Sequence, residues 1–226
     1  MSNLFIVYGS ETKLLQGILN TQDSQFIRIY HNRIPQAQAN AIDVNNFDAF
    51  KLALDKQVAD NNVERIIFIG AAFLVQNNLF ISEKWCEIED MIETNVSSYV
   101  KYSHYLLPYM LKIRSGNFIY LSSFRANVLG RGTSVYSASK AFGEKFFEGI
   151  GKEYGNCGIY SASIRLGCFD GRMFDALGED QKNKWILSIG NRRLGTADDL
   201  VKTIHFVLGN EYTNGGVIEL TGGISF

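Results

Sequence analysis

Residues 66–75 read Ile-Ile-Phe-Ile-Gly-Ala-Ala-Phe-Leu-Val and form the longest apolar run of the chain, interrupted only by Gly70. A run of ten residues is too short to cross a bilayer as a helix, which takes about 20. An apolar run without alternating polar residues is typical of a strand that is buried on both faces of a parallel sheet. We therefore expect a central strand that ends near Ile69 and is followed by a turn.

Similar short runs recur along the chain and alternate with stretches whose apolar residues have helical spacing. This alternation is typical of a parallel sheet with helices on both faces. No linker or repeat interrupts it, so we predict one domain over residues 1–226, an α/β fold with a single doubly wound parallel sheet of about seven strands. The predicted strands are residues 4–8, 26–30, 41–44, 66–69, 117–121, 159–164 and 217–220, and the predicted helices lie near 12–20, 46–60, 82–114, 136–154 and 197–208.

The charge balance and the cysteines argue against a nucleic-acid-binding protein and against a disulfide-bonded or metal-binding one. The 226 residues include 22 basic and 23 acidic ones, a net charge of −1, so no overall field attracts a nucleic acid. The first ten residues lack the basic and long apolar regions of a secretory signal, and no segment is long enough to span a membrane. Three cysteines, at positions 86, 157 and 168, are not at metal-ligand spacing and are expected to be reduced thiols of a cytoplasmic protein. The three histidines are not clustered, so no metal site is predicted.

The first predicted strand ends in Tyr8-Gly9-Ser10 and leads directly into a predicted helix. In a doubly wound sheet this turn is where the pyrophosphate of a dinucleotide binds, at the helix N-terminus. Glycines let the backbone approach the phosphates, and only Gly9 is present here. An ordinary turn between a strand and a helix is an equally good interpretation of these residues.

Tyr136 and Lys140 are four positions apart and therefore share one face of a predicted helix. An ammonium group beside a phenol favours the phenolate and lowers the tyrosine pKa, which would make Tyr136 a general acid or base. Such a pair also arises by chance on a solvated helix, so the spacing alone does not decide between the two interpretations.

Further residues make the chain resemble the short-chain dehydrogenase/reductase family along its whole length. The family places a serine at the end of the strand that precedes its tyrosine, and Ser123 lies thirteen residues before Tyr136. The family also has an asparagine in the preceding long helix, where Asn95 lies. Other matches are Asp43-Val44, Arg193-Leu194-Gly195 and Thr221-Gly222-Gly223. The resemblance implies a Rossmann-like fold and an oxidoreductase that uses a nicotinamide cofactor, NAD or NADP.

The resemblance also implies a role for each catalytic residue. Tyr136 would donate a proton to the developing alkoxide while hydride reaches the carbonyl carbon. Lys140 would lower the tyrosine pKa and hold the nicotinamide ribose, Ser123 would orient the carbonyl, and Asn95 would support a water that links Lys140 to solvent. The cofactor would be bound by Gly9, Ser10, Leu14, Arg33, Asp43, Val44, Gly70, Ala71 and Gly167 together with Tyr136 and Lys140.

The chain departs from the family pattern mainly at the cofactor. Two of the three glycines of the first turn are missing, and a bulky Leu15 stands at the place of one. The segment after the fourth strand is Ile69-Gly70-Ala71-Ala72 instead of Asn-Asn-Ala-Gly, and Leu166-Gly167 replaces Pro-Gly.

The residues after the second predicted strand favour one of the two cofactors. An acidic residue there would accept hydrogen bonds from the ribose of NAD, but residues 26–33 contain none and end in His31-Asn32-Arg33. We therefore expect a preference for NADP(H), with Arg33, and His31 or Lys13 beside it, on the 2′-phosphate. The alternatives are solvated cations at these positions and the use of NAD(H).

The substrate and the assembly are less clearly indicated. Phe124 and Trp185 are candidate apolar walls, and Arg125 could contact an acidic group of the substrate. The helices near 95–114 and 136–154 carry apolar residues on more than one face, so we predict a homodimer or homotetramer through them; burial within one subunit is the alternative. We predict an NADPH-linked reductase of an oxoacyl or keto-sugar carbonyl, and as the alternative a catalytically silent nucleotide-binding or regulatory subunit.

Overall fold

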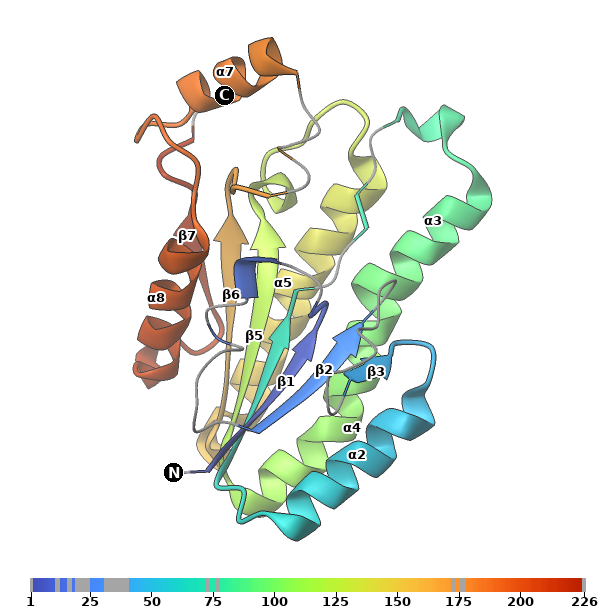
Figure 1. Cartoon of the computed structure of the whole chain (residues 1–226), viewed down its shortest axis with the longest axis vertical. Coiled ribbons are helices and arrows are strands. Elements are labelled where there is room, and N and C mark those ends of the chain that lie inside the picture. Colours follow the sequence, from blue (N-terminus) through green and yellow to red (C-terminus); the bar gives the residue numbers. More distant parts are fainter. Residues whose placement is uncertain are drawn as a thin grey trace.

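The computed structural model describes residues 2–10, 13–15, 18, 25–30, 41–71, 74–75, 78–171, 174 and 178–224. These residues form one seven-stranded sheet in the order β3-β2-β1-β4-β5-β6-β7, and every pair of neighbouring strands is parallel. The predicted doubly wound α/β fold is therefore confirmed (Figure 1). The strands are β1 Asn3–Tyr8, β2 Gln25–Tyr30, β3 Ala41–Asp43, β4 Arg65–Gly70, β5 Gly116–Ser123, β6 Ile159–Leu166 and β7 Gly216–Leu220.

Side-chain alternation in the strands divides the core into two layers. In β1, Leu4, Ile6 and Tyr8 face one hydrophobic cluster, while Phe5 and Val7 face the other. Both faces of a central strand are buried, which explains why its sequence shows no polar alternation. The helices are α2 Phe47–Asp60, α3 Trp85–Ile92, α4 Ser98–Ile113, α5 Ser134–Tyr154, α7 Glu179–Ser188 and α8 Ala197–Leu208.

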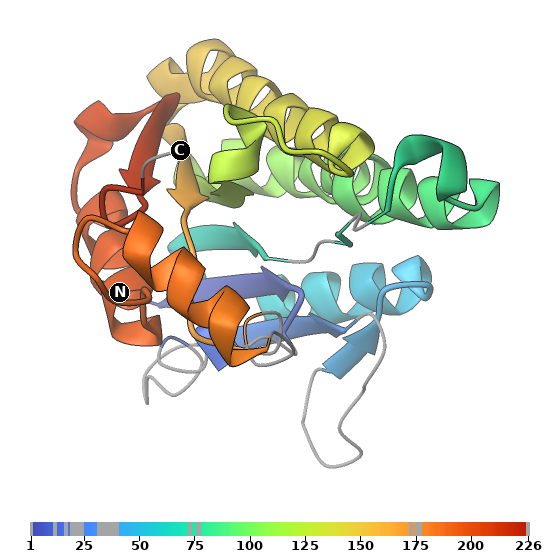
Figure 2. The same ribbon diagram turned by 90° about the horizontal axis from the view of Figure 1, so that it is seen from above.

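The two faces of the sheet carry different helices. Helices α2, α4 and α5 cover one face, where α4 and α5 lie side by side (Figures 1 and 2). This layer is rich in aromatic contacts; the ring centroids of Tyr8 and Tyr99, for example, are 5.1 Å apart. Helix α8 covers the opposite face with Leu200, Ile204 and Val207. Because the central strands are parallel, their carboxyl ends lie at the same edge of the sheet. Doubly wound folds bind their ligands at this edge.

The long helix predicted at 82–114 consists of three parts. Helices α3 and α4 are joined by a π-helical turn, Glu93–Ser97, which contains Asn95. A π-helical turn inside a helix is rare and is found frequently at functional sites. Of the helix predicted near 12–20, the described residues include the 3₁₀ turn Lys13–Leu15.

Helix α7 is not among the predicted helices. None of its side chains is buried, so its sequence has no apolar stripe to indicate a helix. No helix in the described part of the chain is both long and apolar enough to cross a membrane.

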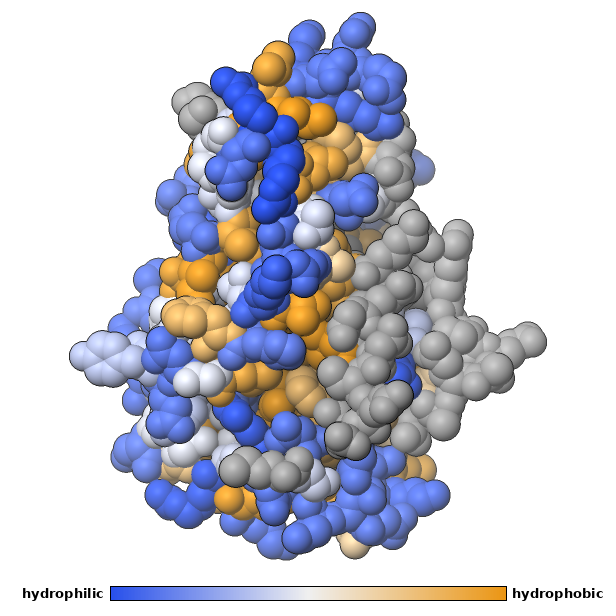
Figure 3. Space-filling view, turned by 60° about the vertical axis from the view of Figure 1, so that its left-hand side comes forward, coloured by the Kyte–Doolittle hydropathy of each residue, from blue (hydrophilic) through white to orange (hydrophobic). Residues whose placement is uncertain are grey.

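The face formed by α8 and the edge strand β7 shows hydrophobic side chains gathered between polar ones (Figure 3). Phe206 on α8 is 54% exposed and Val217 on β7 is 39% exposed. An edge strand with exposed apolar side chains can pair or pack with another chain.

Candidate active site

Helix α5 and strand β5 bring Lys140 into the centre of the candidate site. The Lys140 ammonium donates a hydrogen bond to the carbonyl oxygen of Leu121 over 2.8 Å. It also lies 5.0 Å from the centroid of the Tyr120 ring, within the range of a cation–π contact. Only 1% of Lys140 is exposed, so the long side chain is inserted between the helix and the sheet.

Burial sets the protonation of Lys140. Desolvation lowers the pKa of its ammonium from 10.5 to about 7, while the charge of Glu144 acts in the opposite direction. The charge of Lys140 therefore changes within the neutral range, unlike that of a lysine on the surface.

Tyr136 lies one turn before Lys140 on α5, at the end of β5. Its hydroxyl is hydrogen-bonded to the Ser123 side chain, so the structure brings these two predicted catalytic residues together. Burial raises the pKa of Tyr136 to about 12, although Ser123 and the charge of Arg125 lower it. Desolvation of the phenol dominates this pKa, and the predicted lowering of the Tyr136 pKa by Lys140 stays a prediction.

Asn95, in the π-helical turn, is fully buried and joins three segments. Its Oδ1 accepts a hydrogen bond from the Leu74 amide over 2.8 Å, and its Nδ2 donates to the Leu74 carbonyl over 2.9 Å. Nδ2 also donates to Ser139 Oγ over 3.0 Å, and that hydroxyl donates to the Tyr136 carbonyl over 2.7 Å. The Asn95 side chain thus ties the segment after β4 to α5, and its support of a water stays a prediction.

The turn after β1 has the conformation that a glycine allows. Gly9 has φ 91°, in the left-handed region. The amides of Gly9 and Ser10 both donate hydrogen bonds to the Ile29 carbonyl of β2, over 3.0 and 3.1 Å. In this structure the two amides are therefore bonded within the protein. Leu15 is fully buried in the core on the α8 side, and Leu14 packs beside that core.

The other predicted cofactor residues lie at the carboxyl ends of the strands. Gly70 is the last residue of β4 and Ala71 follows it, and Gly167 follows β6, so all three lie at the same sheet edge as Gly9. A Cβ on Gly70 would be 2.2 Å from Tyr99 Cε1, and one on Gly167 would be 2.8 Å from the Thr221 Cα. Close packing therefore accounts for both glycines.

Asp43 is the last residue of β3 and Val44 follows it, whereas a third predicted cofactor residue, Arg33, lies outside the described residues. The Asp43 carboxylate accepts a hydrogen bond from the Asn45 amide over 2.8 Å. The Val44 amide donates to the Tyr30 carbonyl over 2.9 Å, which fixes the end of β3 beside β2. Arg33, the residue predicted to bind the 2′-phosphate, and His31 are not described.

Phe124, Arg125 and Trp185, which are predicted to lie around the substrate, contact one another, and their contact with a substrate stays a prediction. The rings of Phe124 and Trp185 meet edge to face with centroids 6.1 Å apart. The Arg125 guanidinium lies 4.8 Å from the Phe124 centroid and 5.7 Å from the Trp185 centroid. This aromatic contact with α7 holds the arginine near the phenol of Tyr136.

A cavity of about 140 Å³ lies beyond the ends of β6 and β7. Arg193 borders it and forms a two-pronged ion pair with Asp199, at 2.7 and 3.0 Å. The two late family matches, at 193–195 and 221–223, thus meet around one cavity. Its lining consists of Cys168, Phe169, Asn191, Arg193, Gly195, Asp199, Leu220, Thr221 and Gly222.

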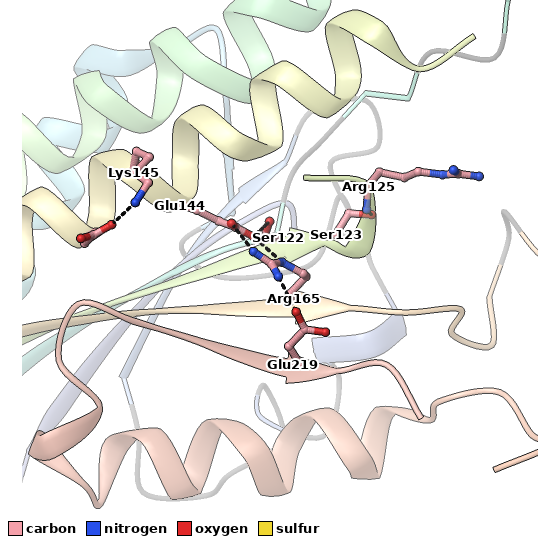
Figure 4. A network of polar contacts seen from close by, with 8 residues as sticks. Ser122, Ser123, Arg125, Glu144, Lys145, Arg165 and Glu219 are labelled. Carbon is pink, nitrogen blue, oxygen red and sulfur yellow. Dashed lines mark hydrogen bonds and ion pairs between the residues drawn. The ribbon is translucent and has the colours of Figure 1, made fainter. Parts of the chain in front are cut away.

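Sequence reasoning missed a buried polar network beside the predicted catalytic residues of α5 (Figure 4). Glu144 lies one turn after Lys140 and is hydrogen-bonded to Ser122 and Arg165. Arg165 also pairs with Glu219 on β7. The spacing of four residues between Lys140 and Glu144 is a signal that could have found the first member.

The parallel fold and the grouped serine, tyrosine and lysine define a Rossmann-like protein of the dehydrogenase class. A family model described as short chain dehydrogenase matches residues 20–182, and the chain belongs to the short-chain dehydrogenase/reductase family.

Curated relatives include proteins named 3-oxoacyl-[acyl-carrier-protein] reductase FabG. The one from Salmonella typhimurium is 28% identical over 160 residues, which cover 70% of this chain and 66% of that protein. The one from Pseudomonas aeruginosa is 26% identical over 185 residues, which cover 81% of this chain and 74% of that protein. The chain thus spans slightly less than two thirds of the length of the Salmonella relative.

Solved structures share the fold over almost the whole chain. "ElxO with NADP Bound" has a TM-score of 0.82 and 18% identity and covers 98% of both chains. "Crystal structure of gox2181" has a TM-score of 0.82 and 14% identity, covering 98% of this chain and 95% of the other.

Proposed function

We propose that the protein is an NADPH-dependent reductase that converts a carbonyl group to an alcohol. The observation that carries this proposal is the hydrogen bond between Tyr136 and Ser123 above a buried Lys140 at the carboxyl end of β5. A phenol with a pKa of about 12 is protonated at neutral pH, which is the form that donates a proton. The protonated phenol is the form that carbonyl reduction requires.

The chain's own residues divide the remaining chemistry. The Ser123 hydroxyl orients the carbonyl oxygen of the substrate beside the Tyr136 phenol. Tyr136 gives its proton to that oxygen as negative charge develops on it, and the Lys140 ammonium stabilises the resulting phenolate. When bound, NADPH supplies the hydride for the carbonyl carbon and leaves as NADP⁺.

The residues present fit a nicotinamide cofactor, with one adjustment. The left-handed Gly9 lets the chain leave β1 beside β4, where the strand order reverses and doubly wound folds bind dinucleotides. Because the amides of Gly9 and Ser10 are bonded to Ile29, they would have to exchange this bond for one to the pyrophosphate. Lys140 would hold the nicotinamide ribose.

The choice of NADPH and of an oxoacyl substrate rests on two supports. Residues 26–33 contain no acidic side chain to bind the ribose of NAD, and the structurally similar ElxO is described with NADP bound. The FabG relatives are named for 3-oxoacyl reduction, which favours an oxoacyl thioester over a keto-sugar. Arg125, beside Tyr136, would contact an acidic group on such a substrate.

Fluorescence titration with NADPH and NADH, followed by the consumption of NADPH with acetoacetyl-coenzyme A, tests this function. We expect tighter binding of NADPH and oxidation of the cofactor only when the carbonyl compound is present. Tighter binding of NADH would contradict the cofactor assignment. Cofactor binding without turnover of any carbonyl compound would favour the alternative, a silent nucleotide-binding or regulatory subunit, which the loss of two glycines from the first turn suggests.

We infer in addition that the chain acts as one cytoplasmic domain in a homodimer or homotetramer. Helices α4 and α5 lie side by side on the outside of the sheet and expose Val100 and Phe142, at 37% and 40%. Phe142 stacks on Phe146 with ring centroids 5.9 Å apart, which gives the helix pair a flat apolar surface for a second copy. Light scattering on Phe142→Asp should show a smaller particle than the wild type, and an unchanged mass would contradict this interface.

A further inference from the structure

Glu144 is an ionisable residue that the proposed mechanism does not use, although it lies one turn from Lys140. It is 8% exposed, and its Oε1 accepts a hydrogen bond from Ser122 Oγ over 2.6 Å. Arg165 on β6 donates to both of its oxygens, over 3.0 and 2.7 Å. Figure 4 shows Glu144 between Ser122 and Arg165, with Glu219 on the far side of the arginine. The carboxylate is thus held from two strands at once.

These contacts complete a series between α5 and the end of β5. Three consecutive residues of the strand each bond to a different side chain on the same face of the helix. The pairs are Leu121 with Lys140, Ser122 with Glu144, and Ser123 with Tyr136. The outer two pairs contain the catalytic side chains, and the middle pair contains Glu144, which bonds to Arg165 as well.

We propose that Glu144 is a positioning residue for Tyr136 and Lys140, which it serves by holding α5 against β5 and β6 and by placing a negative charge behind the ammonium. The inference rests on the proposed reductase function, because it assigns Glu144 to that site. A buried ion pair alone would be weak support, since such pairs are often replaceable without loss of stability. What distinguishes Glu144 is that its carboxylate bonds the strand residue between the two catalytic contacts.

The charges around Lys140 come from several elements. Tyr136 and Glu144 lie on its own helix, Tyr120 on β5, and Arg125 in the turn after β5. Tyr99 on α4 couples to Tyr136 and Tyr120. Arg165 offsets part of the negative charge of Glu144. Arg165 also pairs with the 55% exposed Glu219, so less of its positive charge is left to oppose Glu144.

The effect of this charge on Lys140 has a definite sign. Glu144 raises the pKa of the ammonium, and burial lowers it to about 7. Without the carboxylate, only Glu219 would oppose the positive charge of Arg165, and the Lys140 ammonium would lose its proton at lower pH. A neutral Lys140 no longer stabilises the phenolate that proton transfer leaves on Tyr136.

Glu144→Gln tests the charge with little change in shape, and Glu148→Gln is the matched control. Glu148 lies one turn further along α5 and pairs with Lys145 and Lys152 at the surface. Titration of Lys140 is followed by nuclear magnetic resonance in protein labelled with carbon-13 at lysine Cε, with Lys140→Arg to assign the signal. We expect the midpoint to fall by about one pH unit in Glu144→Gln and to stay unchanged in Glu148→Gln.

Turnover gives a second readout that a purely structural role would not produce. From a midpoint of about 7, a fall of about one pH unit reduces the protonated fraction about twofold at pH 6 and about tenfold at pH 8. The loss of kcat in Glu144→Gln should follow this pH dependence, and Glu144→Asp, which keeps the charge, should restore the wild-type midpoint. Equal losses at both pH values with an unchanged midpoint would overturn the inference.

A second variant and the substrate-free titration keep the test of Glu144 decisive. If Glu144→Gln does not fold, Ser122→Ala removes the hydrogen bond between β5 and the Glu144 carboxylate while the charges of Glu144 and Lys140 remain. We expect kcat to fall about threefold and the melting temperature to stay within a few degrees of the wild type. An unchanged kcat would overturn the positioning role. The titration of Lys140 needs no substrate. A wild type that reduces no carbonyl compound would therefore refute the proposed function, while the midpoint in Glu144→Gln would still decide the role of Glu144.

Discussion

Asn95 Nδ2 donates a hydrogen bond to Ser139 Oγ over 3.0 Å and so joins the π-helical turn between α3 and α4 to the helix that carries Tyr136 and Lys140. Both side chains are buried, and Ser139 passes the contact on to the Tyr136 carbonyl. The same amide group holds Leu74 after β4, so one side chain connects the segment after β4 with α5.

Asn95→Ala should therefore lower the free energy of unfolding by about 2–4 kcal/mol, because it leaves the partly buried amide and carbonyl of Leu74 and the buried Ser139 hydroxyl without their partner. Urea denaturation measures the loss. Asn62→Ala, at an exposed position before β4, is the control and should change stability by less than about 0.5 kcal/mol. Equal stability of the two variants would show that the Asn95 contacts contribute nothing net.

Lys140 should make stability depend on pH in a direction opposite to that of a paired surface lysine. Its pKa is 10.5 in the unfolded chain and about 7 in the folded protein, so between these values the unfolded state binds the extra proton. The free energy of unfolding therefore rises with pH in this window, by up to about 1.4 kcal/mol per pH unit from this group.

Lys140→Met removes that contribution, so it should stabilise the protein most at pH 6 and progressively less towards pH 10. Chemical denaturation of both proteins across this range gives the difference directly, because the other titrating groups cancel. Lys56→Met on the exposed side of α2 should show no such trend. A stability difference that is constant with pH would mean that Lys140 is not desolvated as the structure shows.

The parts of the fold that the sequence indicates are those in which burial leaves a local pattern. The run at 66–69 predicts β4 because both of its faces are covered, and the spacing of Tyr136 and Lys140 predicts their common helix face. The prediction for β5 ended at Leu121, whereas the strand continues to Ser123, since hydroxyl side chains at the strand end carry no apolar signal. Helix α7 has no buried face and left no pattern either.

Other features depend on contacts between distant segments and so have no local signal. Ser122 and Glu144 are 22 positions apart, and only the packing of α5 on β5 brings them together. The direction of the Tyr136 pKa depends on the balance between desolvation and hydrogen bonding, which the sequence does not contain. The π-helical turn at Asn95 likewise interrupts a stretch whose apolar spacing indicates a continuous helix.

Two glycines of α5 should respond in opposite ways to alanine. A Cβ on Gly143 would lie 2.2 Å from Tyr120 Cζ, whereas a Cβ on Gly149 would meet nothing within 4 Å. Gly143→Ala should destabilise the protein by about 1–3 kcal/mol through overpacking, and Gly149→Ala should stabilise it by about 0.5–1 kcal/mol through helix propensity. Thermal denaturation of the two variants checks the signs.

Gly143→Ala should also reduce turnover, because it displaces the Tyr120 ring on which the Lys140 ammonium rests. We expect a loss of kcat of about tenfold, compared with no loss in Gly149→Ala. Unchanged kcat in Gly143→Ala, with the expected loss of stability, would show that the position of the Tyr120 ring is not coupled to Lys140.

Tyr136→Phe tests the proton donor itself. The ring remains to fill its buried position, but the hydroxyl that bonds to Ser123 is lost. Loss of a general acid costs about 10²–10⁴ in rate, so we expect kcat for carbonyl reduction to fall by at least about a hundredfold while the NADPH affinity stays within about threefold. Tyr212→Phe, at a fully exposed position, is the control and should leave both quantities unchanged. Reduction by Tyr136→Phe at a rate near that of the control would rule out Tyr136 as the acid, and would leave Ser123 and Lys140 as the groups to which the chemistry must be assigned.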